Sequence, residues 1–218
     1  MGQKITNRLS NTTIEGSYTG GNSVVNINYY GHQPEEDIKE NNGNKTIFLS
    51  YNWHDGKIAD RIDKHLSGVS NILVRRDVRD IGSWKSIREF MEGIRQQDYA
   101  VLIVSDSYLK SKNCMFEITE MMKEREYVDR IFPAVVESGI YDPLVRAEYI
   151  SYWQQECDKL EAALRGLDPA NAVELAADLK RYKNIAFSVG EFLNIVADMN
   201  NPDIQEVEIQ IEKAILKN

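Results

Sequence analysis

Residues 99–118, YAVLIVSDSYLKSKNCMFEI, carry the pattern from which the fold can be inferred. The first seven are nearly all apolar, which is typical of a strand buried on both faces of a sheet. After a polar segment, Cys114, Ile118, Met121 and Met122 recur at helical spacing, which predicts a helix whose apolar stripe faces that sheet. A buried strand followed by a covering helix is the repeating unit of α/β folds.

Three other apolar runs have the same strand character: KTIFLSY (45–51), SNILVRR (70–76) and RIFPAVV (130–136). Between the strands, helical spacing predicts helices over residues 55–66, with Asp55 as N-cap, and over residues 85–95. Strands without polar alternation that alternate with helices predict a parallel sheet covered by helices on both faces.

From residue 141 onward the pattern is helical only. We predict helices over residues 144–164, 169–182 and 185–199, and a last amphipathic helix over residues 203–216. These helices either complete the same domain, which is the interpretation favoured here, or form an independent helical module.

The domain plan has four parts. Residues 1–31 form a β-rich arm, in which runs 12–19 and 23–30 flank Gly20 and Gly21 as in a hairpin. A floppy leader is the alternative, because chain termini are often disordered. Residues 32–44 are a linker, residues 45–200 the main domain, and residues 201–218 a C-terminal helix.

Composition excludes several classes of function. The 218 residues carry a net charge of −8 and only short basic clusters, which argues against nucleic acid or an anionic membrane as partner. The histidines lack metal-ligand spacing, and neither a phosphate-binding glycine motif nor GxSxG occurs. No signal peptide is evident, and Cys114 and Cys157 lie far apart, so we expect reduced thiols in a cytoplasmic protein.

Glu117 is the one residue of the 99–118 stretch whose role is open. Ligands of parallel sheets gather beyond the carboxyl ends of the strands, and Glu117 lies beside the stripe of the helix that follows such an end. Its carboxylate either projects into the cleft or is a solvated side chain near a helix start, where the macrodipole favours negative charge.

Four segments in order resemble Toll/interleukin receptor (TIR) domains, particularly bacterial ones: KTIFLSYNWHD, RRDVRDIGSWKSIREFMEGI, YAVLIVSDSYLKSKNCMFEI and IFPAVV. The resemblance covers residue 45 to about residue 199. It implies a flavodoxin-like parallel sheet, and it aligns Glu117 with the catalytic glutamate of members that cleave NAD⁺ at the nicotinamide–ribose bond. NAD⁺ is then the substrate, and neither a cofactor nor a metal is implied.

The resemblance also suggests where the substrate would lie. Residues implied to line the site after the first strand are Ser50, Tyr51, Asn52 and Trp53. A mobile loop after the second strand would contribute Arg76, Asp77, Asp80, Gly82 and Trp84, the last as a stacking ring. Many enzymatic members have Trp four residues before the glutamate, and this chain has Asn113, which removes one stacking wall.

Structural alternatives exist for several of these side chains. Trp53 and Trp84 could instead pack partly on the sheet edge, because Trp is usually mostly buried. Ser50 and Ser105 are either polar contacts or residues that merely end strands, and Asp77 and Asp80 suit a solvated loop.

Three functions fit this sequence. The first is an NAD⁺ glycohydrolase, with a linear or cyclic product, that becomes active on self-assembly and serves bacterial antiphage defence. Its partners would be further copies, joined through the TIR domain and the N-terminal arm, and a separate sensor protein. The second is a non-enzymatic adaptor or scaffold that acts through TIR–TIR contacts, and the third is a virulence factor that mimics host TIR domains. The presence of Glu117 favours the enzyme.

Overall fold

The computed structural model describes residues 4–9, 12–17, 30–31, 44–76, 97–168 and 172–217. The chain divides into two units, residues 1–42 and 43–218, which we describe separately. None of the helices in the described ranges is long and apolar enough to cross a membrane.

The first unit contains a small antiparallel sheet of β1 (Lys4–Leu9), β2 (Thr12–Ser17) and β3 (Tyr30–Gly31). The expected hairpin paired residues 12–19 with residues 23–30. Within the described residues, Thr12 pairs with Gly31 and Thr13 with Tyr30, as the outer end of such a hairpin would, and residues 18–29 lie outside the described residues. In addition, β2 pairs along its whole length with β1, to which the sequence analysis assigned no strand. The polar composition of Lys4–Leu9 hid this strand, because its pairing depends on a partner and not on its own hydrophobic pattern.

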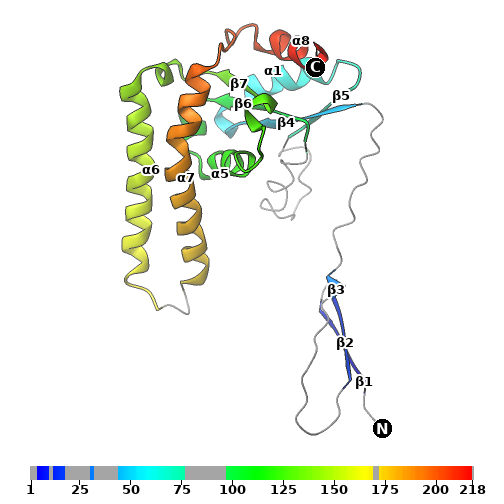
Figure 1. Cartoon of the computed structure of the whole chain (residues 1–218), viewed down its shortest axis with the longest axis vertical. Coiled ribbons are helices and arrows are strands. Elements are labelled where there is room, and N and C mark those ends of the chain that lie inside the picture. The colour runs from blue at the N-terminus through cyan, green and yellow to red at the C-terminus, as the bar shows by residue number, and fades with distance from the viewer. Residues whose placement is uncertain are drawn as a thin grey trace. The chain divides into compact units, whose positions relative to one another are not determined.

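The second unit is built on a parallel sheet, as the sequence predicts (Figure 1). Its strands are β4 (Lys45–Ser50), β5 (Ile72–Arg75), β6 (Tyr99–Val104) and β7 (Ile131–Val135), in the order β5-β4-β6-β7. The chain moves from β4 outward to β5 and then returns to the other side of β4 to form β6. This reversal of strand order between β4 and β6 is where α/β sheets open a crevice at their carboxyl ends.

Helices cover both faces of this sheet. They are α1 (Gly56–Leu66), α4 (Asp106–Leu109), α5 (Lys112–Met121), α6 (Pro143–Leu164), α7 (Val173–Asp198) and α8 (Val207–Lys217). Short 3-10 turns cover Trp53–Asp55, Tyr127–Arg130 and Ser138–Tyr141. Because strand side chains alternate, Ile47 and Leu49 pack in one core with α1 and α8, while Phe48 packs in the other core with α4, α5 and α7.

The helical part beyond residue 141 shares the core of the sheet. Val189, Phe192 and Leu193 of α7 are buried with residues of α5, and α6 runs beside α7 as an antiparallel pair (Figure 1). The two helices expected over residues 169–182 and 185–199 are one helix, α7. The division was wrong because neither Pro nor Gly occurs at residues 183–184, so nothing interrupts the backbone hydrogen bonds there.

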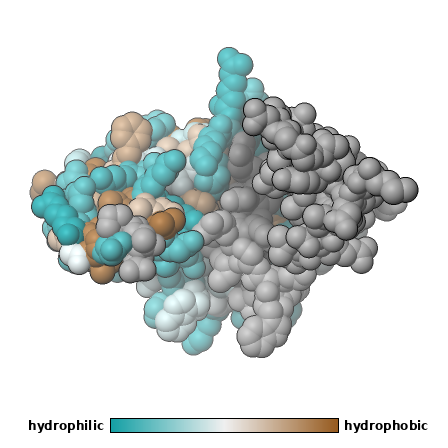
Figure 2. All heavy atoms as spheres, turned by 90° about the horizontal axis from the view of Figure 1, so that it is seen from below, coloured by the Kyte–Doolittle hydropathy of each residue, from teal (hydrophilic) through white to brown (hydrophobic). Residues whose placement is uncertain are grey.

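The exposed apolar side chains do not form one continuous area on the face seen in Figure 2, where hydrophobic and hydrophilic residues are interspersed. The most exposed large apolar residues of the described ranges come from different elements: Trp53, Leu144, Val173 and Phe187. Such scattered residues are common on protein surfaces.

Candidate functional site

A buried chain of hydroxyl groups ends at the carboxylate of Glu117. The Ser50 hydroxyl, at the carboxyl end of β4, donates a short hydrogen bond to Glu117 Oε2 on α5. The Tyr108 hydroxyl on α4 lies 2.8 Å from Ser50 Oγ. Ser50 is 1% exposed, Tyr108 0% and Glu117 6%. The end of β4 therefore meets α4 and α5, which lie more than 50 residues later in the chain, at the switch point of the sheet.

Glu117 is not a solvated residue at a helix start. Helix α5 begins at Lys112, where the Ser111 hydroxyl accepts a hydrogen bond from the backbone N–H of Cys114. Glu117 therefore lies in the second turn, and its side chain is buried. The alternative interpretation of this glutamate is excluded, because a buried carboxylate needs hydrogen-bond partners, which Ser50 supplies here.

The direction of these hydrogen bonds follows from counting protons. Ser50 has one hydroxyl proton and donates it to Glu117, so the contact between Ser50 and Tyr108 needs the phenol as donor. Burial raises the pKa of Tyr108 well above its ordinary value, and the nearby Cys114 and Glu117 raise it further, whereas the Ser50 hydrogen bond opposes the rise. The phenol is therefore protonated at neutral pH and able to donate.

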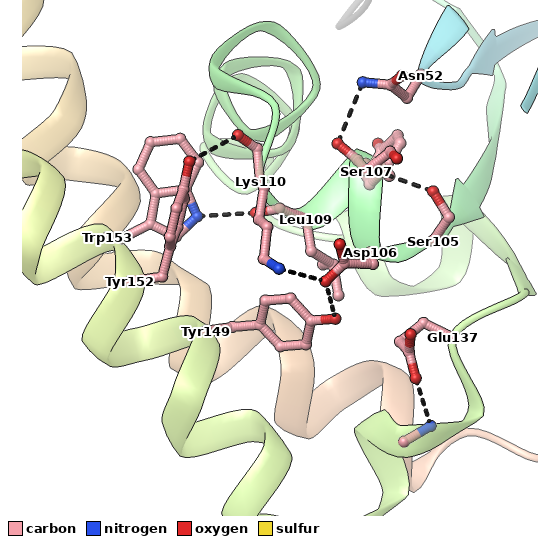
Figure 3. A network of polar contacts seen from close by, with 12 residues as sticks. Asn52, Ser105, Asp106, Ser107, Leu109, Lys110, Glu137, Tyr149, Tyr152 and Trp153 are labelled. Atoms are coloured by element: carbon pink, nitrogen blue, oxygen red, sulfur yellow. Dashed lines mark hydrogen bonds and ion pairs between the residues drawn. The ribbon is translucent and has the colours of Figure 1, made fainter. Parts of the chain in front are cut away.

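Two further hydrogen bonds tie the loop after β4 to the loop after β6. The Asn52 side-chain amide donates to the carbonyl of Ser107 at 3.1 Å, and Ser105 Oγ donates to Asp55 Oδ2 at 2.6 Å. Figure 3 shows the hydrogen bond from Asn52 to Ser107. Asp55 occupies the N-cap position of α1, as predicted, but its side chain caps no backbone N–H. The Asp55 carboxylate instead accepts the hydrogen bond from Ser105, because the ends of β4 and β6 lie side by side.

Helix α4, which carries Tyr108, is held from its other side by α6 (Figure 3). Tyr149 donates from its hydroxyl to Asp106 Oδ1 at 2.9 Å, and Lys110 pairs with the same carboxylate at 2.7 Å. The Trp153 indole N–H donates to the carbonyl of Leu109 at 2.9 Å. These contacts explain how a helix of four residues keeps a fixed position.

The hydrogen bonds among Asp106, Lys110 and Tyr149 shift the pKa values of Asp106 and Tyr149. Burial by itself raises the pKa of Asp106, but the hydrogen bonds from Lys110 and Tyr149 outweigh it and lower that pKa. Burial and the hydrogen bond to Asp106 raise the pKa of Tyr149. The structure therefore favours the charged form of the Asp106 side chain.

Tyr51 and Arg76 lie on the opposite face of the sheet from α5. Tyr51 belongs to the core that β4 shares with α1, because it alternates with Ser50 along the chain. The Arg76 guanidinium stacks on the Tyr51 ring, 4.8 Å from its centroid, and donates to the Tyr51 hydroxyl at 2.7 Å. Arg76 also pairs with Asp60 at 2.8 Å and with Asp63 at 3.2 Å, both on α1.

The pKa of Arg76 reflects this setting. Burial lowers it, but the hydrogen bonds to Tyr51, Asp60 and Asp63 raise it by more, so the pKa lies above its ordinary value. The structure thus places Arg76 at the end of β5 as an anchor on α1, and it does not bring Tyr51 toward the face on which Glu117 lies.

Among the predicted site residues that the structure describes, Trp53 and Asn113 are exposed to solvent. Trp53 is 76% exposed and stacks on the His54 ring, with centroids 3.5 Å apart, so the alternative of packing on the sheet edge is wrong for this residue. Asn113 is exposed on α5, one turn before Glu117. Asp77, Asp80, Gly82 and Trp84 lie outside the described residues, as does the helix expected over 85–95.

Sequence reasoning missed Tyr108 and the partnership of Ser105 with Asp55. Tyr108 falls in a short polar segment without periodicity, and its hydroxyl meets a residue 58 positions away. Only the side-by-side pairing of β4 with β6 could have suggested the Ser105–Asp55 pair, since both residues follow the ends of adjacent strands.

A separate cavity of about 550 Å³ lies beside the outer strand β7. Its walls come from β7, from residues 199–203 and from residues 206–214 around α8, and none of the predicted site residues lines it. Among the described residues, no group of three or more His, Cys, Asp or Glu side chains is placed to hold a metal ion.

Comparison with known proteins identifies the family. A family model described as "TIR domain" matches residues 47–167, which is more than half of the chain and runs from β4 through α6. No curated protein and no solved structure matches the chain. The matched region contains Ser50, Tyr108 and Glu117, so the site described above lies wholly inside it. The chain therefore belongs to the TIR domain family.

Proposed function

We propose that this protein cleaves NAD⁺ at the bond between nicotinamide and ribose, with Glu117 as the catalytic residue. In NAD⁺ the nicotinamide ring carries a positive charge, so it leaves as a neutral base with the electron pair of the breaking C1′–N bond. No general acid is needed. Positive charge then develops on C1′ and the ring oxygen of the ribose, and a nearby carboxylate stabilises it.

The observation that carries this proposal is the hydrogen bond from Ser50 to a buried Glu117 at the carboxyl end of the central strand. Burial strengthens the interaction of the carboxylate with a developing positive charge, because little water screens it. The hydrogen bond from Ser50 favours the ionised form of the carboxyl, which is the form the reaction requires.

The remaining steps need no further charged group. Attack of water on C1′ yields ADP-ribose and releases a proton, whereas attack by an adenine nitrogen of the same molecule yields a cyclic isomer. The exposed ring of Trp53, close in sequence to Ser50, is available to stack on one of the two bases of NAD⁺. In this proposal Asn113, one turn before Glu117, leaves the side of the site without the aromatic wall that many enzymatic members have.

The test is nicotinamide release from NAD⁺ by concentrated protein, measured for wild type and for Glu117→Gln. The substitution keeps the shape of the side chain and removes its charge, so activity should fall by at least about 100-fold. Glu120→Gln is the matched control: Glu120 lies on the same helix, is equally buried, and pairs with Lys123 rather than Ser50. Equal activity of Glu117→Gln and wild type would overturn the proposal.

TIR domains also include non-enzymatic adaptors, and one observation favours that second function. Glu117 is only 6% exposed, so a substrate would have to reach an almost fully buried carboxylate. If wild-type protein releases no nicotinamide at any protein concentration or salt condition, yet still self-associates, the adaptor function is the correct one.

We extend the proposal to regulation by self-assembly. TIR domains commonly self-associate. Among the described strands of the N-terminal unit, β1 lies at an edge of the sheet, and an edge strand can pair with a strand of another chain. Deletion of residues 1–31 should then lower both particle size in solution and NAD⁺ cleavage per molecule. A role in bacterial antiphage defence would follow if cells that produce the protein, but not the Glu117→Gln variant, lose NAD⁺ and resist phage.

A further inference from the structure

We propose that Tyr108 is a positioning residue for the reaction: through Ser50, it holds the Glu117 carboxylate ionised and correctly oriented. This inference rests on the proposed function, in which Glu117 is the reacting carboxylate. The Tyr108 hydroxyl lies 2.8 Å from Ser50 Oγ, and the Ser50 hydroxyl in turn donates to Glu117 Oε2, so Tyr108 acts on the carboxylate through Ser50.

The first step of the argument is the direction of the chain. The phenol donates to Ser50, and Ser50 donates to the carboxylate, so both O–H dipoles point their positive ends toward the negative charge. Each bond polarises the next, which makes Ser50 a stronger donor than an isolated serine. The ionised form of Glu117 gains from this arrangement, and the neutral form gains less.

The second step is rigidity. Tyr108 is fully buried in the core, and its backbone N–H is capped by Ser105 at 3.1 Å. Helix α4 is fixed by α6 through the hydrogen bond from Trp153 to Leu109. The phenol therefore stays in place, so the Ser50 side chain has one favourable rotamer and the carboxylate has one favourable position.

The third step is that no other group in the described surroundings of Tyr108 can replace its hydroxyl as the donor to Ser50. The titratable groups that face it are Cys114 and Glu117, both on α5, and neither donates a proton to Ser50 in the structure. Since Ser50 is 1% exposed, water does not readily replace the phenol. Loss of the phenol hydroxyl would leave the Ser50 oxygen without its donor and weaken its bond to Glu117.

The first experiment compares pH–rate profiles of NAD⁺ cleavage for wild type and Tyr108→Phe, which removes one oxygen and keeps the ring. We expect kcat/KM at neutral pH to fall about two- to tenfold. The acidic limb of the profile should move to higher pH by about half to one unit, because the carboxylate loses part of its stabilisation.

The matched control is Tyr127→Phe. Tyr127 is 8% exposed and shares a core with Tyr108, but its hydroxyl has no hydrogen-bond partner. This variant should keep the wild-type profile. A similar loss in both variants, or an unmoved acidic limb in Tyr108→Phe, would overturn the positioning role and leave Tyr108 as a packing residue.

A double-mutant cycle tests whether the effect passes through Ser50. Ser50→Ala alone should move the acidic limb further than Tyr108→Phe does, since it removes the direct donor to Glu117. Adding Tyr108→Phe to Ser50→Ala should then change the limb by less than about 0.2 pH units, because the link is already broken. Additive shifts would contradict action through Ser50.

A measurement independent of activity separates this inference from the proposed function. In protein labelled with ¹³C at the glutamate carboxyl, the Glu117 signal is identified by its absence in Glu117→Gln and titrated by NMR. Tyr108→Phe should raise the midpoint of that titration, and Tyr127→Phe should not. If the midpoint moves but wild type cleaves no NAD⁺, the role of Tyr108 in the hydrogen-bond chain is supported and the proposed function is wrong. If wild type cleaves NAD⁺ but the midpoint does not move, the proposed function is supported and the positioning role of Tyr108 is wrong.

Discussion

Ser105, just after β6, donates a 2.6 Å hydrogen bond to Asp55, at the start of α1, and thereby joins the ends of two adjacent parallel strands. The same Ser105 oxygen accepts a hydrogen bond from the backbone N–H of Tyr108, so it also caps α4. One side chain thus connects the loop after β4, the loop after β6 and the helix that supports Glu117 through Ser50.

Removing this hydroxyl should destabilise the protein. We expect Ser105→Ala to lower the free energy of unfolding by about 1–3 kcal/mol, because it removes a helix cap and leaves Asp55 without that donor. Urea denaturation followed by circular dichroism measures the change. Ser151→Ala is the control, since Ser151 is exposed on α6 and bonds only Gln155 within its own helix, so its effect should stay below about 0.5 kcal/mol.

Replacing Arg76 should lower the free energy of unfolding much more than replacing its neighbour Arg75. Arg76 is buried and holds Tyr51, Asp60 and Asp63, so Arg76→Ala should cost about 2–4 kcal/mol of unfolding free energy. Arg75→Ala should cost less than about 0.5 kcal/mol, because Arg75 is exposed. Equal effects in urea denaturation would mean that the guanidinium network does not hold β5 to α1.

The Asp106 carboxylate should make stability depend on pH in the acidic range. Its pKa is lower in the folded protein than its ordinary value of 3.8, so its contribution is present above that value and is lost as pH falls through the folded pKa. The difference in unfolding free energy between wild type and Asp106→Asn should therefore be largest above about pH 5 and shrink toward about pH 2. The difference stays below about 1 kcal/mol, because the side chain is half exposed and solvent screens it. A difference that is constant with pH would contradict the assignment.

Trp53 should matter for substrate and not for stability. Because the ring is exposed, Trp53→Ala should change the unfolding free energy by less than about 0.5 kcal/mol. If the ring stacks on a base of NAD⁺, KM should rise at least about fivefold while kcat changes little, and Trp53→Phe should restore most of the affinity. Steady-state kinetics on the three proteins decides this. An unchanged KM in Trp53→Ala would remove this residue from the proposed site.

Much of the fold was predictable because the spacing of apolar residues along the chain indicates strands and helices locally. The apolar run over residues 99–105 predicted a strand buried on both faces, and β6 is one, with Val101 and Ile103 in one core and Ala100, Leu102 and Val104 in the other. The helix over residues 144–164 was predicted almost to the residue. The false break in α7 shows the limit of that approach, since periodicity detects a helix but locates its ends poorly where no breaker residue stands.

What the sequence by itself determined is the order of strands and helices, the parallel sheet they imply, and the presence of an acidic residue on the helix after β6. Tertiary structure alone decided that Glu117 is buried, that its partner is Ser50, and that Tyr108 completes the chain. The physical reason is range: hydrophobic spacing acts within a few residues along the chain. A hydrogen bond between side chains 58 or 67 positions apart exists only after the sheet has brought the ends of its strands together.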